Sequence, residues 1–249
     1  MSNLFVLFVK AAVFIVIFLF KTPIFLISLS VHEFSHGFAA YFLGDDTAKR
    51  AGRLTLNPVA HIDIFGLIML FIAHFGWAKP VPINPYNFRD FKRDTAITAA
   101  AGPISNFLIA ILFAVILKIY TNFNPEVLFG TGSSLLVFIL LLFTVFINLA
   151  LGIFNLLPIP PMDGSKILGG FLSDAAYAKY TAKEHQGMRI LMLVFLISFV
   201  FRINIIGPII LPPIDLLTNL LTGYDSNVLF NGVDILIKQF TYYFVNLIT

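Results

Sequence analysis

Two histidines and a glutamate lie in the middle of an apolar stretch that runs from Ile24 to Tyr41. His32 and His36 are four residues apart, so a helix would place both imidazoles on one face, one turn apart. Both rings could then reach one zinc ion, and Glu33 could reach a water molecule at that ion. This H-E-x-x-H spacing is typical of zinc-dependent hydrolases. The same spacing could also arise by chance in a soluble helix, or the histidines could be core residues with local hydrogen-bond partners.

The composition places this motif in a membrane protein. Of the 249 residues, 59% are hydrophobic and only 12% are charged, whereas a soluble domain is typically about 45–50% apolar and about 25% charged. A charged residue near the centre of a membrane helix costs at least about 2.5 kcal/mol, so three ionisable groups there favour a functional site. The chain has no cysteine, which excludes disulfides and thiolate metal sites. The net charge of +3 comes without a basic run, so nothing indicates a nucleic-acid partner.

A catalytic zinc site needs a third protein ligand, with one position left open. The candidates outside the motif are His61, Asp63, His74, Asp163, Glu184 and His185. Asp163 fits best, because it follows a proline-rich break at the end of an apolar segment, and such a break could turn the side chain inward. A plain turn in which Asp163 caps the next helix accounts for the same residues equally well.

The remaining candidates fit simpler roles. The Glu184–His185 pair lies in a polar segment and fits a solvated face. His61 and Asp63 could support either the site or the fold. His74, close to a tryptophan, fits a position at the membrane interface better than a metal ligand.

The apolar segments predict an all-α polytopic membrane protein with about six transmembrane helices and a small β-strand or re-entrant region between the second and third. We expect spans at Leu4–Phe20, Ile24–Leu43, Thr95–Ile119, Ser134–Leu157 and Met188–Ile206, with one more after Pro208. Lys21–Pro23 would form a tight turn between the first two spans. Residues 1–249 are expected to form one integral-membrane domain, with a catalytic core at 22–172 and C-terminal helices at 188–249.

The region between the second and third spans is the least helical part of the chain. Arg53–Leu56 is predicted to be a short strand, and the apolar segment Ile62–Ala73 is too short to span a bilayer, which favours an interfacial or re-entrant position. In the stretch 76–83, Pro80 and Pro82 remove two N–H groups from the same side, which predicts an edge strand.

The other edge of that strand keeps its donors and could hold an unwound substrate. The residues expected to bind substrate in this way are Ala78, Lys79, Val81 and Ile83. The strand could instead pair only within the protein, because exposed edges are usually covered.

The loop charges predict an orientation. Basic residues gather in the segments 44–95 and 158–189, whereas the loop 121–133 carries none. An even number of predicted crossings separates the two basic segments, so both should face the cytoplasm. We therefore expect a multi-pass protein of the plasma or inner membrane, with its active site towards the cytoplasmic side.

Five motifs occur in an order that resembles the site-2 protease family of intramembrane zinc metalloproteases, over roughly residues 22 to 172. They are His32-Glu33-Phe34-Ser35-His36, Asn57-Pro58-x-x-His61-Ile62-Asp63, Gly76-Trp77-Ala78-Lys79-Pro80-Val81-Pro82, Ala101-Gly102-Pro103-x-x-Asn106, and the run from Phe154 through Pro158-Ile159-Pro160-Pro161-Met162-Asp163 to Gly164. The chain is similar to compact family members without PDZ or CBS domains. It departs from many relatives at Ile64, where they have proline.

The resemblance implies roles for individual residues. The position matching Asp163 is the third ligand of a single zinc ion, beside His32 and His36, and the position matching Glu33 is the catalytic glutamate. Asn148 matches a position near the active site that is implicated in polarising the scissile carbonyl.

The predicted function is that of a zinc-dependent endopeptidase that cuts within or near transmembrane segments of membrane-protein substrates. A non-proteolytic protein such as a divalent-metal transporter is the main alternative, because transporters also place such residues at helix breaks. Glu33 next to His32 and the lack of repeated halves argue against it. A catalytically inactive relative that acts as a membrane chaperone is a second alternative, against which the presence of all four core residues argues.

Overall fold

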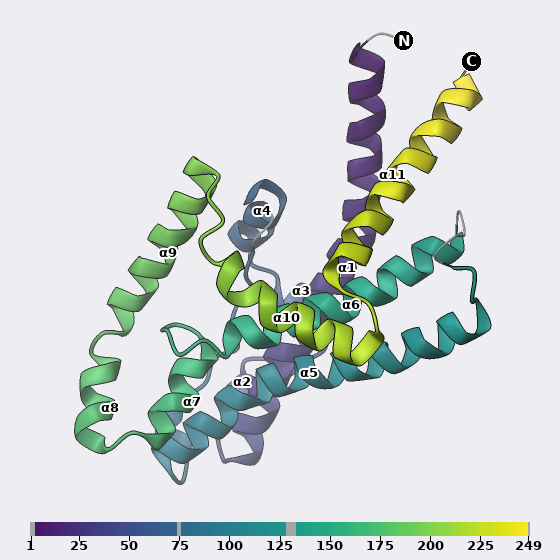
Figure 1. Cartoon of the computed structure of the whole chain (residues 1–249). Coiled ribbons are helices and arrows are strands. Elements are labelled where there is room, and N and C mark those ends of the chain that lie inside the picture. The colour runs from purple at the N-terminus through teal and green to yellow at the C-terminus, as the bar shows by residue number, and fades with distance from the viewer. Residues whose placement is uncertain (1–2, 74–75, 128–132, 249) are drawn as a thin grey trace. The chain divides into compact units, whose positions relative to one another are not determined.

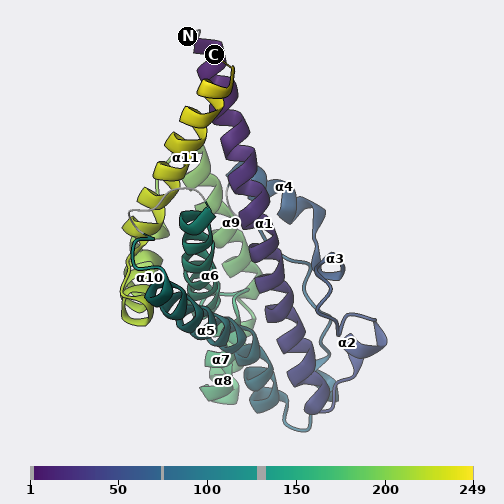
Figure 2. The ribbon, with the colours of Figure 1, turned by 90° about the vertical axis from the view of Figure 1, so that its right-hand side faces the viewer.

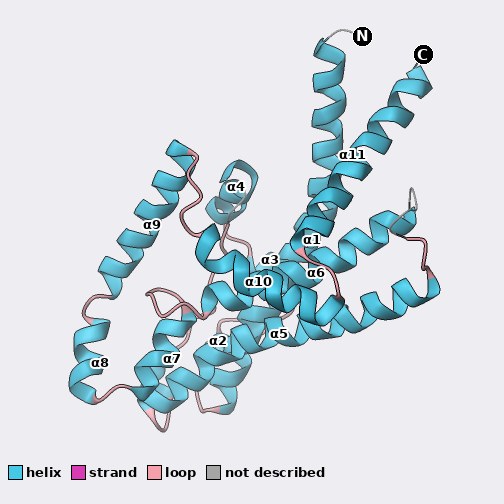
Figure 3. Ribbon diagram, in the orientation of Figure 1, coloured by secondary structure: helices cyan, strands magenta, loops and turns pink. Residues whose placement is uncertain are grey.

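The computed structural model describes residues 3–73, 76–127 and 133–248, and within these residues the chain is helical without a β-strand (Figures 1 and 3). The helices are α1 Asn3–Phe42, α2 Thr47–Arg50, α3 Pro58–His61, α4 Ile64–Ala73, the 3₁₀ turn η1 Pro85–Asn87, α5 Phe91–Phe123, α6 Ser133–Asn155, α7 Asp163–Phe171, α8 Asp174–Thr181, α9 Glu184–Phe201, α10 Gly207–Thr222 and α11 Ser226–Ile248. The predicted all-α class is therefore confirmed.

The chain divides into two compact units, which are described separately. One comprises residues 1–25, 109–149 and 214–249, and the other comprises 26–108 and 150–213. The core of the first unit is formed by large apolar side chains from α5, α6 and α11 and from the connection after α5. Its buried members are Leu117, Val127, Leu135, Phe138, Ile139, Leu142, Leu229 and Leu236.

The first helix differs from the prediction. Two spans joined by a turn at Lys21–Pro23 were expected, but α1 runs without interruption through Pro23. Proline fixes a backbone angle that a helix accepts and removes only one helical hydrogen bond. The preceding Thr22 hydroxyl donates to the Phe18 carbonyl at 2.8 Å, which gives this turn a side-chain bond. A proline within an apolar run was therefore not sufficient to end the helix.

Two helices among the described residues are long and apolar enough to cross a membrane, α5 and α6. A third candidate is the pair 174–181 and 185–201, which is bent by 46° at its break. The structure thus supports two or three of the about six predicted spans. The last segment forms two helices, because Gly223 adopts φ +83° and ends α10. That left-handed conformation is open mainly to glycine.

After α1 the chain doubles back along the C-terminal half of that helix (Figure 2). The predicted strand Arg53–Leu56 is not formed. The Thr55 hydroxyl accepts the Asn57 N–H at 3.2 Å, so a local side-chain bond replaces a ladder there. In the described part of this region the only β pairing is a single antiparallel bridge between Ile62 and Ala78. The short apolar segment forms α4, ten residues long, which is too short to span a bilayer, as predicted.

Asp45 fixes the end of α1 to the segment before α5. Its fully buried carboxylate accepts the Asn84 N–H and the Asn87 side-chain amide, both at 2.7 Å, together with the N–H and hydroxyl of Thr47. Burial raises the pKa of the Asp45 carboxyl, but these hydrogen bonds outweigh it and hold that pKa below its ordinary value.

The lowered pKa predicts that the contribution of Asp45 to the stability of the fold is lost in acid. Because the folded pKa lies below the unfolded one, the stabilisation is fully present above the unfolded value, about 3.9, and is lost as pH falls through the folded value. Thermal unfolding of the detergent-solubilised protein between pH 6 and pH 3 should show this against Asp45→Asn. The difference in melting temperature between the wild type and Asp45→Asn should shrink as pH falls. A difference that is independent of pH would contradict this role of the Asp45 carboxylate.

Candidate metal centre

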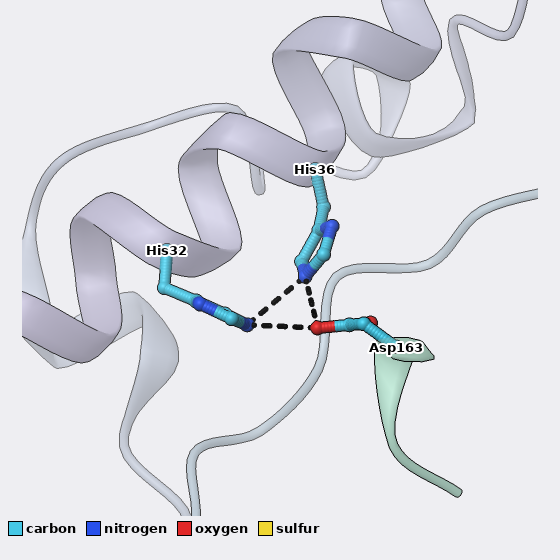
Figure 4. A group of neighbouring side chains, drawn as sticks. All are labelled: His32, His36 and Asp163. Atoms are coloured by element: carbon cyan, nitrogen blue, oxygen red, sulfur yellow. Dashed lines mark hydrogen bonds and ion pairs between the residues drawn. The ribbon is translucent and has the colours of Figure 1, made fainter. Parts of the chain in front are cut away.

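The two histidines of the motif lie on the buried side of α1. His32 and His36 are 4% and 6% exposed, and their rings meet edge to face with centroids 4.6 Å apart. The i, i+4 spacing on a helix accounts for this arrangement. Both Nε2 atoms point to the same place, as Figure 4 shows.

Asp163 reaches the same place from the first position of α7. The predicted proline-rich turn precedes it, and Met162 rather than Asp163 occupies the N-cap position. A role for Asp163 as the capping residue is therefore not supported. The turn is tight, because a Cβ added at Gly164 would lie 2.1 Å from the Leu156 carbonyl oxygen. Only glycine fits after Asp163 without moving the backbone.

The three side chains form a compact triangle of possible ligand atoms. His32 Nε2 and His36 Nε2 are 3.0 Å apart, and Asp163 Oδ2 lies 3.3 Å from the first and 3.2 Å from the second. Four ligands at about 2.0–2.1 Å from a tetrahedral zinc ion are separated by roughly 3.3–3.4 Å. The triangle thus has nearly the size that one tetrahedral ion requires. It is the one such group of His, Cys, Asp and Glu found among the described residues.

The hydrogen-bond partners of the two Nδ1 atoms determine which nitrogen of each ring carries the proton. His36 Nδ1 lies 2.8 Å from the Thr98 carbonyl oxygen, and His32 Nδ1 lies 2.6 Å from Asn106 Oδ1. Both partners are acceptors, so each Nδ1 carries the proton and each Nε2 presents a lone pair. Two lone pairs and a carboxylate oxygen then converge within a buried volume, an arrangement that calls for a cation between them. The residues present therefore fit a zinc ion.

Gly102 of α5 leaves room for this centre. A Cβ at that position would lie 2.4 Å from His36 Nε2 and 2.6 Å from His32 Cε1. Real Cβ atoms essentially never approach so closely, and both rings are buried, so they cannot give way easily. Thr98, Gly102 and Asn106 recur every four residues, which puts all three on the face of α5 that meets the histidines.

Glu33 lies beside the triangle and has a partner of its own. Its half-buried carboxylate accepts the Val81 N–H at 2.9 Å. The Lys79 N–H donates to the His61 carbonyl at 2.9 Å, and the Lys79 carbonyl accepts Arg53 Nη2 at 2.7 Å. Two of the donors expected to meet a substrate are thus bonded within the protein. Ala78 forms the bridge to Ile62, and Ile83 follows in the same extended segment.

Of the other candidate ligands, His61, Asp63 and His185 lie outside the metal group. His61 is buried, and its Nε2 donates to the Thr55 carbonyl at 2.8 Å. Asp63 accepts the Gly66 N–H at 2.8 Å at the start of α4. His185 is exposed, and Glu184 begins α9. His74 lies outside the described residues.

Asn148 belongs to the other compact unit, where it is buried in α6 and its amide donates to the Thr144 carbonyl at 2.9 Å. Its role near the site stays a prediction. The sequence placed Gly102 and Asn106 in a family-like motif, with Gly102 among small residues that permit close helix approach, but it predicted no contact of Thr98, Gly102 or Asn106 with the histidines. A signal was available for one of them, because an asparagine within an apolar helix calls for a polar partner.

Comparison with known proteins gives concordant results. The profile of peptidase family M50 matches residues 21–199. A relative from Bacillus subtilis (strain 168), named "Putative zinc metalloprotease YwhC", is 39% identical over 177 residues, which are 70% of this chain and 77% of that protein. Two proteins with the same description and the name Rip2 are 28% identical over 177 residues, in Mycolicibacterium smegmatis, and 30% over 178 residues, in Mycobacterium tuberculosis (strain H37Rv). Each of these two alignments covers 69% of this chain and 64% of the relative. No solved structure matches the chain.

The close approach of α5 predicts the effect of Gly102→Ala. The added methyl group would occupy the space between the rings, so we expect loss of zinc from the purified protein. The helix content should persist, because alanine is favoured over glycine in a helix by about 1 kcal/mol. Metal analysis and circular dichroism test this, with Ala101→Gly as the control at the neighbouring position. A Gly102→Ala protein with one zinc per chain would show that the site has more room than the structure indicates.

The bond from Asn106 predicts a graded loss of zinc affinity. Without the acceptor for Nδ1, the His32 ring loses its fixed tautomer and orientation, and such losses typically weaken metal binding about 10- to 100-fold. Competition with a chelator should show this for Asn106→Ala. Ser105→Ala, one residue earlier, removes a hydroxyl that donates to the Gly102 carbonyl of the same helix, and its affinity should stay at the wild-type value. Equal affinities for Asn106→Ala and the wild type would refute the role.

Proposed function

The chain belongs to peptidase family M50, the site-2 protease family that its motifs resemble, and is a zinc metalloendopeptidase; from this premise we propose that it cuts peptide bonds within or near transmembrane segments of membrane proteins. The observation that carries the proposal is the buried His32–His36–Asp163 triangle with a carboxylate beside it. His32, His36 and Asp163 would hold the zinc ion. When bound, zinc supplies Lewis-acid polarisation to a substrate carbonyl and to a water molecule.

Glu33 acts as the general base in this proposal. It follows His32 directly on α1, and its carboxylate is half-buried, so it borders the metal group without belonging to it. One carboxylate oxygen takes a proton from the attacking water, and the same group later gives a proton to the leaving amine. A positioned base of this kind contributes about 10²- to 10⁴-fold to the rate.

The surfaces of α1 and α5 support a site that works within a bilayer. On α1 the buried side carries the histidines, whereas Phe38 and Phe42 are 45% and 71% exposed. On α5, Thr98 and Asn106 are buried, whereas Ile104, Leu108 and further apolar side chains are exposed. A helix in water has the reverse pattern, with its apolar side buried. Polar groups facing inward and apolar groups facing outward suit a lipid environment.

A membrane-spanning substrate has to unwind before its peptide bond is accessible, because its helical hydrogen bonds shield that bond. We propose that the unwound segment lies along residues 78–83. Since the Lys79 and Val81 donors are bonded inside the protein, pairing would use the carbonyl groups of Pro80 and Pro82 and N–H groups of the substrate. Water would enter from the cytoplasmic face, towards which the basic segment 44–95 points in the predicted orientation.

Replacing Glu33 by glutamine tests the proposed function. Glu33→Gln removes the base but none of the three ligands, so the protein should keep one zinc per chain and lose its cleavage activity at least about 100-fold. Membrane proteins that accumulate uncut in cells producing the variant would be the substrates, identified by mass spectrometry of the membrane fraction.

Glu126→Gln, which changes an exposed glutamate in the connection after α5, is the matched control and should behave as the wild type. If cells with Glu33→Gln show the same new termini as wild-type cells, the protein is not a protease with this base. If the wild type carried metal ions across the membrane and neither the wild type nor Glu33→Gln cleaved a membrane protein, the result would indicate a transporter.

A further inference from the structure

The Glu33 carboxylate is held by a backbone group from a distant part of the sequence. Oε2 accepts the Val81 N–H at 2.9 Å, across 48 residues of sequence. In the run Pro80-Val81-Pro82 this is the sole N–H group, because proline has none. The bond therefore depends on the one non-proline residue at the centre of this run.

The surroundings of Val81 fix the direction of its N–H. The Val81 side chain is 7% exposed and lies close to Gly37 of α1, where an added Cβ would be 3.9 Å from Val81 Cγ1. Prolines restrict their own backbone angles and favour an extended conformation of the residue before them. Upstream, both backbone groups of Lys79 are bonded within the same unit. The donor is thus placed before any substrate arrives.

We propose that the backbone N–H of Val81 positions the catalytic carboxylate. With Oε2 bonded, rotation of the carboxylate is restricted, and Oε1 is the oxygen left to accept the proton from water. A hydrogen bond from a neutral donor to a charged acceptor is among the stronger ones in proteins. This role rests on the proposed function of Glu33 as the base.

The inference makes the N–H, and not the valine side chain, the functional group at this position. Any residue except proline can supply it. A purely structural role for Val81 predicts the opposite, because buried apolar contact would then matter and the N–H would not. The two roles separate when the side chain and the N–H are removed independently.

The test compares variants that remove one feature each. Val81→Ala keeps the N–H and removes two methyl groups, whereas Val81→Pro removes the N–H. The α-hydroxy analogue of valine at position 81 replaces the N–H by an ester oxygen and keeps the isopropyl group. Lys79→Pro is the matched control. It removes the other N–H of this segment that is bonded within the protein, and this N–H donates to the His61 carbonyl rather than to Glu33.

Cleavage of a single-pass membrane substrate identified through Glu33→Gln would be measured in liposomes, with zinc content measured for each protein. Loss of a hydrogen bond to a charged group corresponds to about 10- to 100-fold in kcat. We expect this loss for the ester and for Val81→Pro, with one zinc per chain and KM within about twofold of the wild type. Val81→Ala should retain at least about tenfold more kcat than the ester, and Lys79→Pro should act on KM more than on kcat.

Three results would overturn the inference: wild-type kcat in the ester variant, an equal loss of kcat in Lys79→Pro, or a loss confined to KM. If Val81→Pro fails to fold, the ester variant decides. Glu33→Gln, measured alongside, separates this inference from the proposed function. An active Glu33→Gln would remove both, whereas an inactive Glu33→Gln with an ester variant as active as Val81→Ala would remove only the role of Val81.

Discussion

The structure depends on three hydrogen-bond acceptors that converge in a buried place. The Nε2 atoms of His32 and His36 and the carboxylate of Asp163 lie 3.0–3.3 Å apart, and both rings are held in the tautomer that directs a lone pair inward. Without a positive charge between them such groups repel one another, and the low effective dielectric of the interior strengthens the repulsion. The same arrangement becomes favourable once a divalent cation is bound, so metal binding and the stability of this part of the fold are coupled.

Glycines, which have no side chain, provide the space around these acceptors. Gly102 lets α5 pass directly over the imidazoles, and Gly164 lets the turn before α7 close against the Leu156 carbonyl. Gly37 brings the residues after α1 close to the helix, with Ala48 3.2 Å from the position of an added Cβ. Each glycine is unfavourable for an isolated helix, yet each allows an approach that a methyl group would prevent. Close backbone approach through small residues is a common feature of helix packing in membranes.

The sequence predicted the grouping of His32, His36 and Asp163 better than it predicted the backbone around them. Spacing alone pairs His32 with His36, because helical geometry is regular, and the break before Asp163 is visible as a cluster of prolines. The continuous α1 was missed, since whether Pro23 ends a helix depends on what packs around it. The strand at Arg53–Leu56 was wrong because a local bond to the Thr55 hydroxyl competes with a ladder. The partner of Asn106 is His32, 74 residues away in the sequence, and this pairing is fixed by tertiary packing, which one sequence does not encode in a readable form.

The candidate site is built from helices and from one extended segment. The residues proposed as metal ligands stand on helices, whose hydrogen-bonded backbones hold them at fixed distances. The carboxylate of Glu33, the proposed base, accepts the N–H of Val81 in an extended segment. An extended substrate lying along that segment would contact the same backbone that positions Glu33. The place of the substrate and the direction of the base are then set by one element.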